Sequence, residues 1–91
     1  MLEQMHDLSG KVAVVTGGSR GIGRSISLAL AEAGADIVLN YSRSDKEADK
    51  VKKEIEKFGR KCVTVRANVG NFQQAQNLGK AAVNHFGRVD I

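Results

Sequence analysis

The stretch TGGSRGIG, residues 16–23, has the spacing most indicative of chemistry in this sequence. It follows an apolar run at residues 11–16 and precedes apolar residues at helical spacing, which predicts a strand, a turn and a helix. The unpaired N–H groups and the dipole at a helix N-terminus attract phosphate. We expect Gly17 to let the chain turn, Gly21 to let the backbone approach a pyrophosphate, and Gly23 to let the helix pack closely on the strand. A dinucleotide site is therefore predicted; the alternative is a tight turn that binds nothing.

The end of the second apolar run bears on which dinucleotide would bind. In dinucleotide-binding folds, an acidic residue at this place hydrogen-bonds the ribose 2′-OH of NAD. Tyr41 stands there instead, and Ser42 and Arg43 follow it. Guanidinium groups bind phosphate through forked, charge-assisted hydrogen bonds, and Arg20 adds a second one from the glycine turn. The sequence favours NADP(H), with Arg20, Ser42 and Arg43 converging on its 2′-phosphate; the alternative is two surface arginines without a ligand.

The elements that must position these residues alternate along the chain. Strands are expected over residues 11–16, 36–41 and 61–66, and helices over residues 22–33, 45–58 and 72–86. Two helices carry capping signals, Ser44 with Glu47 and Asn71 with Gln74. Glycine stops follow the helices at Gly34, Gly59 and Gly87.

Each predicted helix has an apolar stripe that should face the sheet. The residues that form these stripes are Ile22, Ile26, Leu28, Ala29, Leu30 and Ala33 in the first helix, Ala48, Val51, Ile55 and Phe58 in the second, and Phe72, Ala75, Leu78, Ala82 and Phe86 in the third.

Alternating strands and helices predict an α/β fold with a doubly wound parallel sheet of order 3-2-1-4. Residues 88–91 read as a turn and the start of the fourth strand. Without that strand the first one would expose an unpaired apolar edge, which natural sheets avoid. Residues 1–91 are therefore expected to be the N-terminal piece of a longer single-domain protein, or to need another chain and to associate through the unfinished sheet.

Composition and charge narrow the classes of partner. The net charge of +4 arises between residues 43 and 66, which hold nine basic and five acidic side chains. Because the signs alternate and few aromatics lie nearby, we interpret this segment as a solvated helix face and predict no nucleic-acid binding; the alternative would show salt-sensitive affinity. No apolar run is long enough to span a bilayer and no secretory signal pattern is evident, so no membrane partner and a cytoplasmic location are expected.

Several motifs together resemble the short-chain dehydrogenase/reductase family. They are the lead-in Leu8, Gly10, Lys11 and Val12, the turn TGxxxGxG at residues 16–23, Asn68-Val69, and Phe86-Gly87 followed by Asp90. Within that family the sequence is most similar to 3-oxoacyl-acyl-carrier-protein reductases of fatty-acid biosynthesis. The resemblance implies a Rossmann-like fold, of which this chain would hold the N-terminal part: three strands and the start of a fourth.

The resemblance also implies a set of cofactor-binding residues. Asn68 stands where the family commonly has an Asp near the adenine amino group and keeps a carbonyl acceptor, and Val69 would line the adenine pocket. A plain strand-end turn is the alternative for this pair. The expected NADP(H)-binding residues are Thr16, Gly17, Gly18, Ser19, Arg20, Gly21, Ile22, Gly23, Tyr41, Ser42, Arg43, Asn68 and Val69.

The family's catalytic residues are not found in this sequence. Its tyrosine acts as acid or base because a lysine four residues later lowers the phenol pKa, which is ordinarily near 10. Asp45, not a lysine, stands four residues after Tyr41, the only tyrosine. Cys62 is expected to be a small residue of the third strand without nucleophilic function, and His6 and His85 lack the spacing of metal ligands. No catalytic residue and no metal site are predicted here.

The resemblance implies that the full-length protein is an NADPH-dependent reductase of a 3-oxoacyl thioester, linked to acyl carrier protein, that assembles as a homotetramer. Enoyl-thioester reductases and sugar dehydrogenases have similar N-terminal sequences and remain alternatives. A non-catalytic nucleotide-binding fragment is the alternative from another class. The 91-residue chain alone is expected to be inactive.

Overall fold

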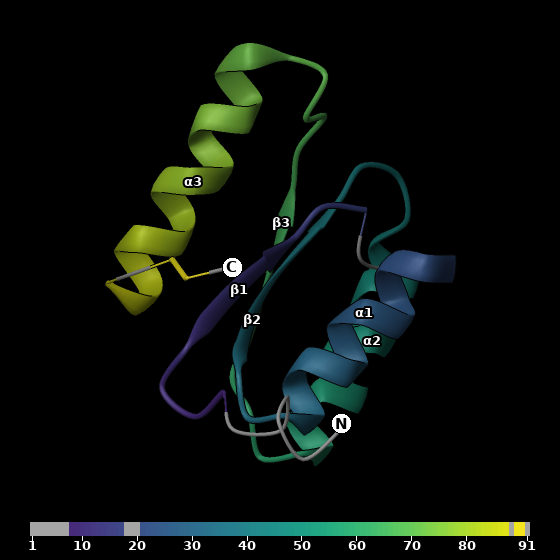
Figure 1. Ribbon diagram of the computed structural model, residues 1–91. Coiled ribbons are helices and arrows are strands. Elements are labelled where there is room, and N and C mark those ends of the chain that lie inside the picture. The colour runs from purple at the N-terminus through teal and green to yellow at the C-terminus, as the bar shows by residue number, and fades with distance from the viewer. Residues whose placement is uncertain (1–7, 18–20, 88, 91) are drawn as a thin grey trace.

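The computed structural model describes residues 8–17, 21–87 and 89–90. Strands and helices alternate in the predicted order (Figure 1). The elements are β1 (Val12–Val15), α1 (Gly21–Glu32), β2 (Asp36–Tyr41), α2 (Asp45–Lys57), β3 (Cys62–Arg66) and α3 (Phe72–Phe86). α1 and α2 cover one face of the sheet, and α3 lies on the other (Figure 1).

The three strands form a parallel sheet of order β1-β2-β3, with β2 in the centre. Ala13 is opposite Ile37, which is opposite Cys62, and Val15 is opposite Leu39. This register confirms the doubly wound α/β prediction for the first three strands. β1 and the middle of β2 are continuous apolar runs, as expected for strands covered on both sides, whereas β3 at the edge is only half-buried over most of its length.

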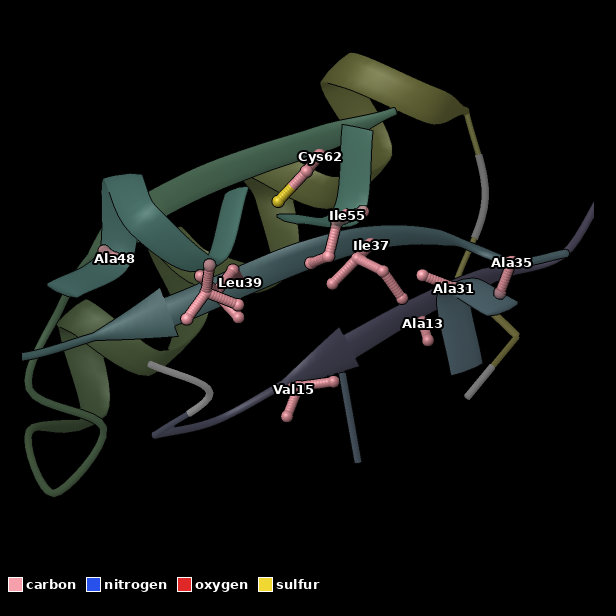
Figure 2. Close-up of a cluster of buried hydrophobic side chains, with 10 residues drawn as sticks. Ala13, Val15, Ala31, Ala35, Ile37, Leu39, Ala48, Ile55 and Cys62 are labelled. Atoms are coloured by element: carbon pink, nitrogen blue, oxygen red, sulfur yellow. The ribbon is translucent and has the colours of Figure 1, made fainter. Parts of the chain in front are cut away.

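The larger part of the core lies between the sheet and the pair α1 and α2 (Figure 2). Ile37 and Leu39 of β2 and Ile55 of α2 are fully buried in it. A smaller cluster on the opposite face joins Val12 and Val38 to Leu78 and Ala82 of α3. The period-2 alternation of β2 therefore sends Ile37 and Leu39 to one face and Val38 to the other.

Both predicted helix caps are confirmed. The Ser44 hydroxyl accepts a hydrogen bond from the Glu47 N–H, and the Asn71 side chain accepts one from the Gln74 N–H. Each satisfies an N–H group that has no partner within its helix. Gly87 then ends α3 in the left-handed conformation, with φ of 77°. No helix in the described part of the chain is long and apolar enough to cross a membrane.

Four expected core residues are instead exposed: Ile22, Ile26, Ala29 and Phe58. Phe58 caps the C-terminus of α2 with non-helical dihedrals and is 45% exposed, because the helix ends one residue before it, at Lys57. Ile22 and Ile26 are 80% and 46% exposed on α1, where the buried residues are Ser27 and Ala31. Small residues let α1 approach the sheet closely, so the bulky isoleucines lie on a different face of the helix.

The expected fourth strand is represented by one residue beside β1. Residues 89 and 90 are not in a strand, but the Asp90 N–H donates to the Val12 carbonyl at 2.8 Å. The Val12 N–H donates to the Asp90 carboxylate at 2.9 Å. Because the adjacent Lys11 carbonyl accepts from Asp36 on the β2 side, the Val12 groups point to the other side of β1. Asp90 thus lies where the predicted order 3-2-1-4 places the fourth strand.

Gly34 is required by the close approach of the N-terminal segment to the end of α1. Its φ is +112°, and a Cβ there would lie 3.0 Å from the Ser9 backbone nitrogen. We expect Gly34→Ala to destabilise the fold by about 2–3 kcal/mol through backbone strain and this clash. Gly79→Ala is the matched control because Gly79 lies within α3 with open space around it. It should instead stabilise the fold by about 0.5–1 kcal/mol. Urea unfolding of the two variants measures both, and equal effects would contradict the role of Gly34.

Candidate functional site

The candidate site lies at the carboxyl ends of the three parallel strands. β1, β2 and β3 all run in one direction, so the segments that follow them emerge at the same edge of the sheet. These segments are the glycine turn, the residues after Tyr41, and the turn at Asn68-Val69. In open α/β sheets this edge is where ligands bind. The fold therefore brings together all three segments that the sequence singled out.

The glycine turn connects β1 to the N-terminus of α1 as predicted. Gly17 has φ of 61° and Gly21 has φ of 52°, conformations that side-chain-bearing residues rarely adopt. A Cβ at either position would have no described atom within 4 Å, so no described side chain fills the space beside these two glycines. Gly18, Ser19 and Arg20 lie outside the described residues.

The residues that flank this turn are accessible. Thr16 is exposed at the end of β1, and Ile22 is exposed in the first turn of α1. Gly23 is half-buried, and its carbonyl accepts a hydrogen bond of 2.8 Å from the Ser27 hydroxyl. No acidic residue lies in the first turn of α1. The exposed positive end of the helix dipole is therefore not neutralised from within that turn.

Tyr41 forms a small polar cluster at the end of β2. Its hydroxyl donates to the Asp45 carboxylate at 2.5 Å, and Arg66 lies 3.7 Å from the other oxygen of that carboxylate. The hydrogen bond to Asp45, together with burial, raises the pKa of Tyr41 above its usual value near 10. Tyr41 is therefore protonated near neutral pH.

The cluster predicts a measurable shift on removal of the Asp45 charge. We expect Asp45→Asn to lower the pKa of Tyr41, because the phenolate would no longer form beside an anion. Tyr41 is the only tyrosine and the chain has no tryptophan, so the ultraviolet absorbance of phenolate in a pH titration reports this group alone. Asp49→Asn, at an exposed residue paired with Lys53, is the control and should leave the titration unchanged. A pKa that stays the same or rises in Asp45→Asn would contradict the assignment.

Ser42 and Arg43 follow β2 and are both exposed at the same edge. The sequence has no acidic residue at the end of β2 itself. In the structure, however, the Asp45 carboxylate lies next to Tyr41, the last residue of that strand. Arg66 compensates part of that charge and adds a cation which the sequence reasoning missed. Its position opposite Tyr41 in the β2–β3 register was the signal that could have found it.

Asn68 and Val69 lie in the turn between β3 and α3. The Asn68 side chain accepts a hydrogen bond from the Gly70 N–H at 3.0 Å, and its own N–H donates to the Gln74 side chain at 2.6 Å. Val69 is 43% exposed. The pair thus forms an Asx turn that α3 holds in place, with the apolar Val69 side chain accessible at the site.

Asn40 is the second residue that the sequence reasoning missed. It is 2% exposed, and its side-chain amide bonds to Gly17 and to the end of β3. Cys62, by contrast, lies where predicted, buried in β3, and burial raises the pKa of its thiol to about 12. It is therefore neither ionised nor accessible near neutral pH. Among the described residues no group of three or more His, Cys, Asp or Glu could hold a metal ion.

The geometry of this edge fits a dinucleotide. The open space beside Gly17 and Gly21 and a first turn of α1 without acidic residues suit a pyrophosphate. The exposed Val69 offers an apolar contact for a base, and Arg43 offers a guanidinium beyond β2.

Comparison with known proteins assigns the family. The model of the short chain dehydrogenase family matches residues 11–91. The chain belongs to this family. The match includes β1, the glycine turn and every later element of the described structure. The family prediction made from the sequence motifs is thereby confirmed.

Individual relatives agree with this assignment. The chain is 46% identical over 84 residues to versicolorin reductase 1 of Dothistroma septosporum, covering 92% of this chain and 32% of that protein. It is 43% identical over 89 residues to a hydroxynaphthalene reductase-like protein of Metarhizium brunneum, covering 98% and 33%. A solved short-chain dehydrogenase/reductase of Serratia marcescens superposes with a TM-score of 0.90 at 39% identity, covering 93% and 35%.

These comparisons show how specific the assignment is. The chain spans about a third of the length of the relatives that it matches. The two curated relatives are named for versicolorin and hydroxynaphthalene, and neither is named as a 3-oxoacyl-acyl-carrier-protein reductase. Family membership and the Rossmann-like fold are established, and the more specific resemblance to that reductase stays a prediction.

Proposed function

We propose that this chain is the dinucleotide-binding N-terminal part of a longer, NADP(H)-dependent oxidoreductase. The observation that carries the proposal is the glycine turn between β1 and α1. Its left-handed Gly17 and Gly21 leave open space at the helix N-terminus, at the carboxyl edge of a parallel sheet. Backbone N–H groups at that position would bind the pyrophosphate. When bound, the nicotinamide ring supplies or accepts a hydride.

The preference for NADP(H) is supported by the charges around the end of β2. No acid occupies the strand-end position of Tyr41, and Arg43 follows two residues later on the exposed edge. Arg20 belongs to the glycine turn in the sequence. The Asp45 carboxylate near the end of β2 is already engaged by Tyr41 and Arg66, which reduces its repulsion of a 2′-phosphate.

The reaction we propose is reduction of a carbonyl, with the catalytic residues contributed by sequence beyond this chain. Within the chain the described groups bind and orient the cofactor. Tyr41 is held by Asp45, and Cys62 is buried, so neither transfers a proton to substrate.

Two substrate classes are supported by different observations. The glycine turn and the NYSRS segment at residues 40–44 resemble 3-oxoacyl-acyl-carrier-protein reductases, which favours a 3-oxoacyl thioester. The 46% identity to a versicolorin reductase favours a substrate of the kind that relative is named for.

The proposal is tested by following NADPH absorbance with the full-length protein. An acetoacetyl thioester should be reduced if the first substrate class applies, and hydroxynaphthalene-type or versicolorin-type ketones if the second does. The 91-residue chain, assayed in parallel, should show no turnover. A full-length protein that binds neither NADPH nor NADH would refute the proposed function.

A further inference from the structure

Asn40 is a buried polar side chain at the centre of the candidate site. It lies in β2, one residue before the strand ends, and is 2% exposed. It lies on the α3 face of the sheet, as does the apolar Val38 two residues earlier. A buried amide costs free energy unless it is hydrogen-bonded, so its partners indicate why this position is polar.

All the polar atoms of the Asn40 side chain have partners. The Oδ1 atom accepts a hydrogen bond from the Gly17 N–H at 3.2 Å. The Nδ2 atom donates to the Ala67 carbonyl at 3.0 Å and to the Val65 carbonyl at 3.3 Å. One planar amide therefore spans from the segment after β1 to the end of β3.

Two of these partners, Gly17 and Ala67, lie just past the ends of β1 and β3, whereas Val65 lies within β3 opposite Asn40. The β1–β2 ladder ends at the pair Val15 and Leu39, two residues before Gly17. The β2–β3 ladder ends at the pair Tyr41 and Arg66, one residue before Ala67. The Ala67 N–H still donates to the Tyr41 carbonyl at 2.9 Å, so β3 stays attached to β2 at this point. The Asn40 amide adds a bond to the Ala67 carbonyl and a bond across to Gly17, beyond the paired residues of both ladders.

The chain leaves β1 and β3 at the two segments that we propose to bind the cofactor. Gly17 begins the glycine turn, and Ala67 directly precedes Asn68-Val69. We propose that Asn40 is a positioning residue for the dinucleotide, whose side chain sets the orientation of the Gly17 peptide and its spacing from the Asn68-Val69 turn. The inference rests on the proposed function and adds to it one residue that touches neither the pyrophosphate nor the base.

A ligand that spans both segments should depend on this spacing, whereas a ligand that occupies only one should not. We expect Asn40→Leu, which replaces the amide with an apolar group of similar size, to weaken NADP⁺ binding by the full-length protein at least tenfold. Binding of adenosine 2′-monophosphate, which has no pyrophosphate, should weaken less than threefold. Dissociation constants are measured well below the unfolding temperature of each variant, so that only folded protein is compared.

Val38→Ala is the matched control. Val38 is fully buried on the same strand and face as Asn40, so its truncation destabilises the same region without removing the link. Its affinity for both ligands should stay at the wild-type value. An Asn40→Leu protein that binds NADP⁺ like the wild type, or that loses both ligands equally, overturns the positioning role while leaving the proposed function intact. A wild-type protein that binds neither NADP⁺ nor NAD⁺ overturns the proposed function itself.

The wild-type protein provides a second test that needs no folded variant. In full-length protein labelled with nitrogen-15 at asparagine, the side-chain NH₂ signals of Asn40 should shift on addition of NADP⁺ and remain unshifted on addition of adenosine 2′-monophosphate. Signals that do not respond to NADP⁺ would overturn the positioning role.

Discussion

Gly21→Ala is expected to weaken binding of NADP⁺ by about 10- to 100-fold, or about 1.5–3 kcal/mol, the worth of one charge-assisted hydrogen bond. Gly21 has a positive φ and open space on the side where a Cβ would project. An added methyl group would occupy that space and push the pyrophosphate away from the N–H groups of the turn. Calorimetric titration of the full-length protein measures the effect.

Gly59→Ala separates this loss from backbone strain. Gly59 has φ of +77° and no described atom near its Cβ position, so alanine there suffers a similar conformational penalty. It follows the C-terminus of α2, away from the glycine turn. We expect Gly59→Ala to lower stability by about 1–2 kcal/mol and to leave NADP⁺ affinity unchanged. Equal affinities of the two variants would show that Gly21 does not border the pyrophosphate.

Replacing both Arg20 and Arg43 with alanine is expected to reduce the difference in binding free energy between NADPH and NADH by about 1.5–3 kcal/mol. The two cofactors differ only in the 2′-phosphate, so their affinity ratio isolates the contacts to that group. Each arginine should contribute a charge-assisted hydrogen bond to it. NADPH affinity should therefore fall while NADH affinity stays nearly constant.

The control for charge alone is the double variant Lys57→Ala and Lys80→Ala. Both lysines are exposed, on α2 and α3, and their removal changes the net charge by the same amount. The ratio of affinities should remain that of the wild type. An unchanged ratio in the arginine variant would mean that other groups, Arg66 first among them, bind the phosphate.

Local signals in the sequence made the helices and strands predictable. Ser44 with Glu47 and Asn71 with Gln74 act within a few residues, and both caps are present as expected. The glycine turn was equally predictable, because the positive φ at Gly17 favours glycine.

The distance between a helix and the sheet, by contrast, cannot be predicted from the spacing of apolar residues in the sequence. The sequence pattern of α1 cannot show that Ser27 and Ala31, and not Ile22 and Ile26, face the sheet. That outcome depends on how closely the helix approaches, which is a tertiary property. Ser27 can be fully buried because its hydroxyl donates a hydrogen bond to the Gly23 carbonyl.

The polar contacts between strands were also beyond sequence reasoning. In the sequence, Asn40 is only a single polar residue in a buried strand. Its contacts with the segments beside β2 can be inferred only once the pairing of β2 with β1 and β3 is known. Arg66 and Asp45 are 21 positions apart in the sequence and meet only because β2 and β3 are paired. Such links are set by topology, so a register prediction is needed before they can be proposed.

The central claim is that the glycine turn at the carboxyl edge of the sheet binds a dinucleotide. Its most direct test is NADP⁺ titration of the full-length protein labelled with nitrogen-15 at glycine. We expect large shifts for the N–H signals of Gly17, Gly21 and Gly23, and none for Gly59 and Gly79, which lie away from that turn. Shifts confined to Gly59 and Gly79, or no shift at Gly17 and Gly21 under saturating NADP⁺, would contradict it.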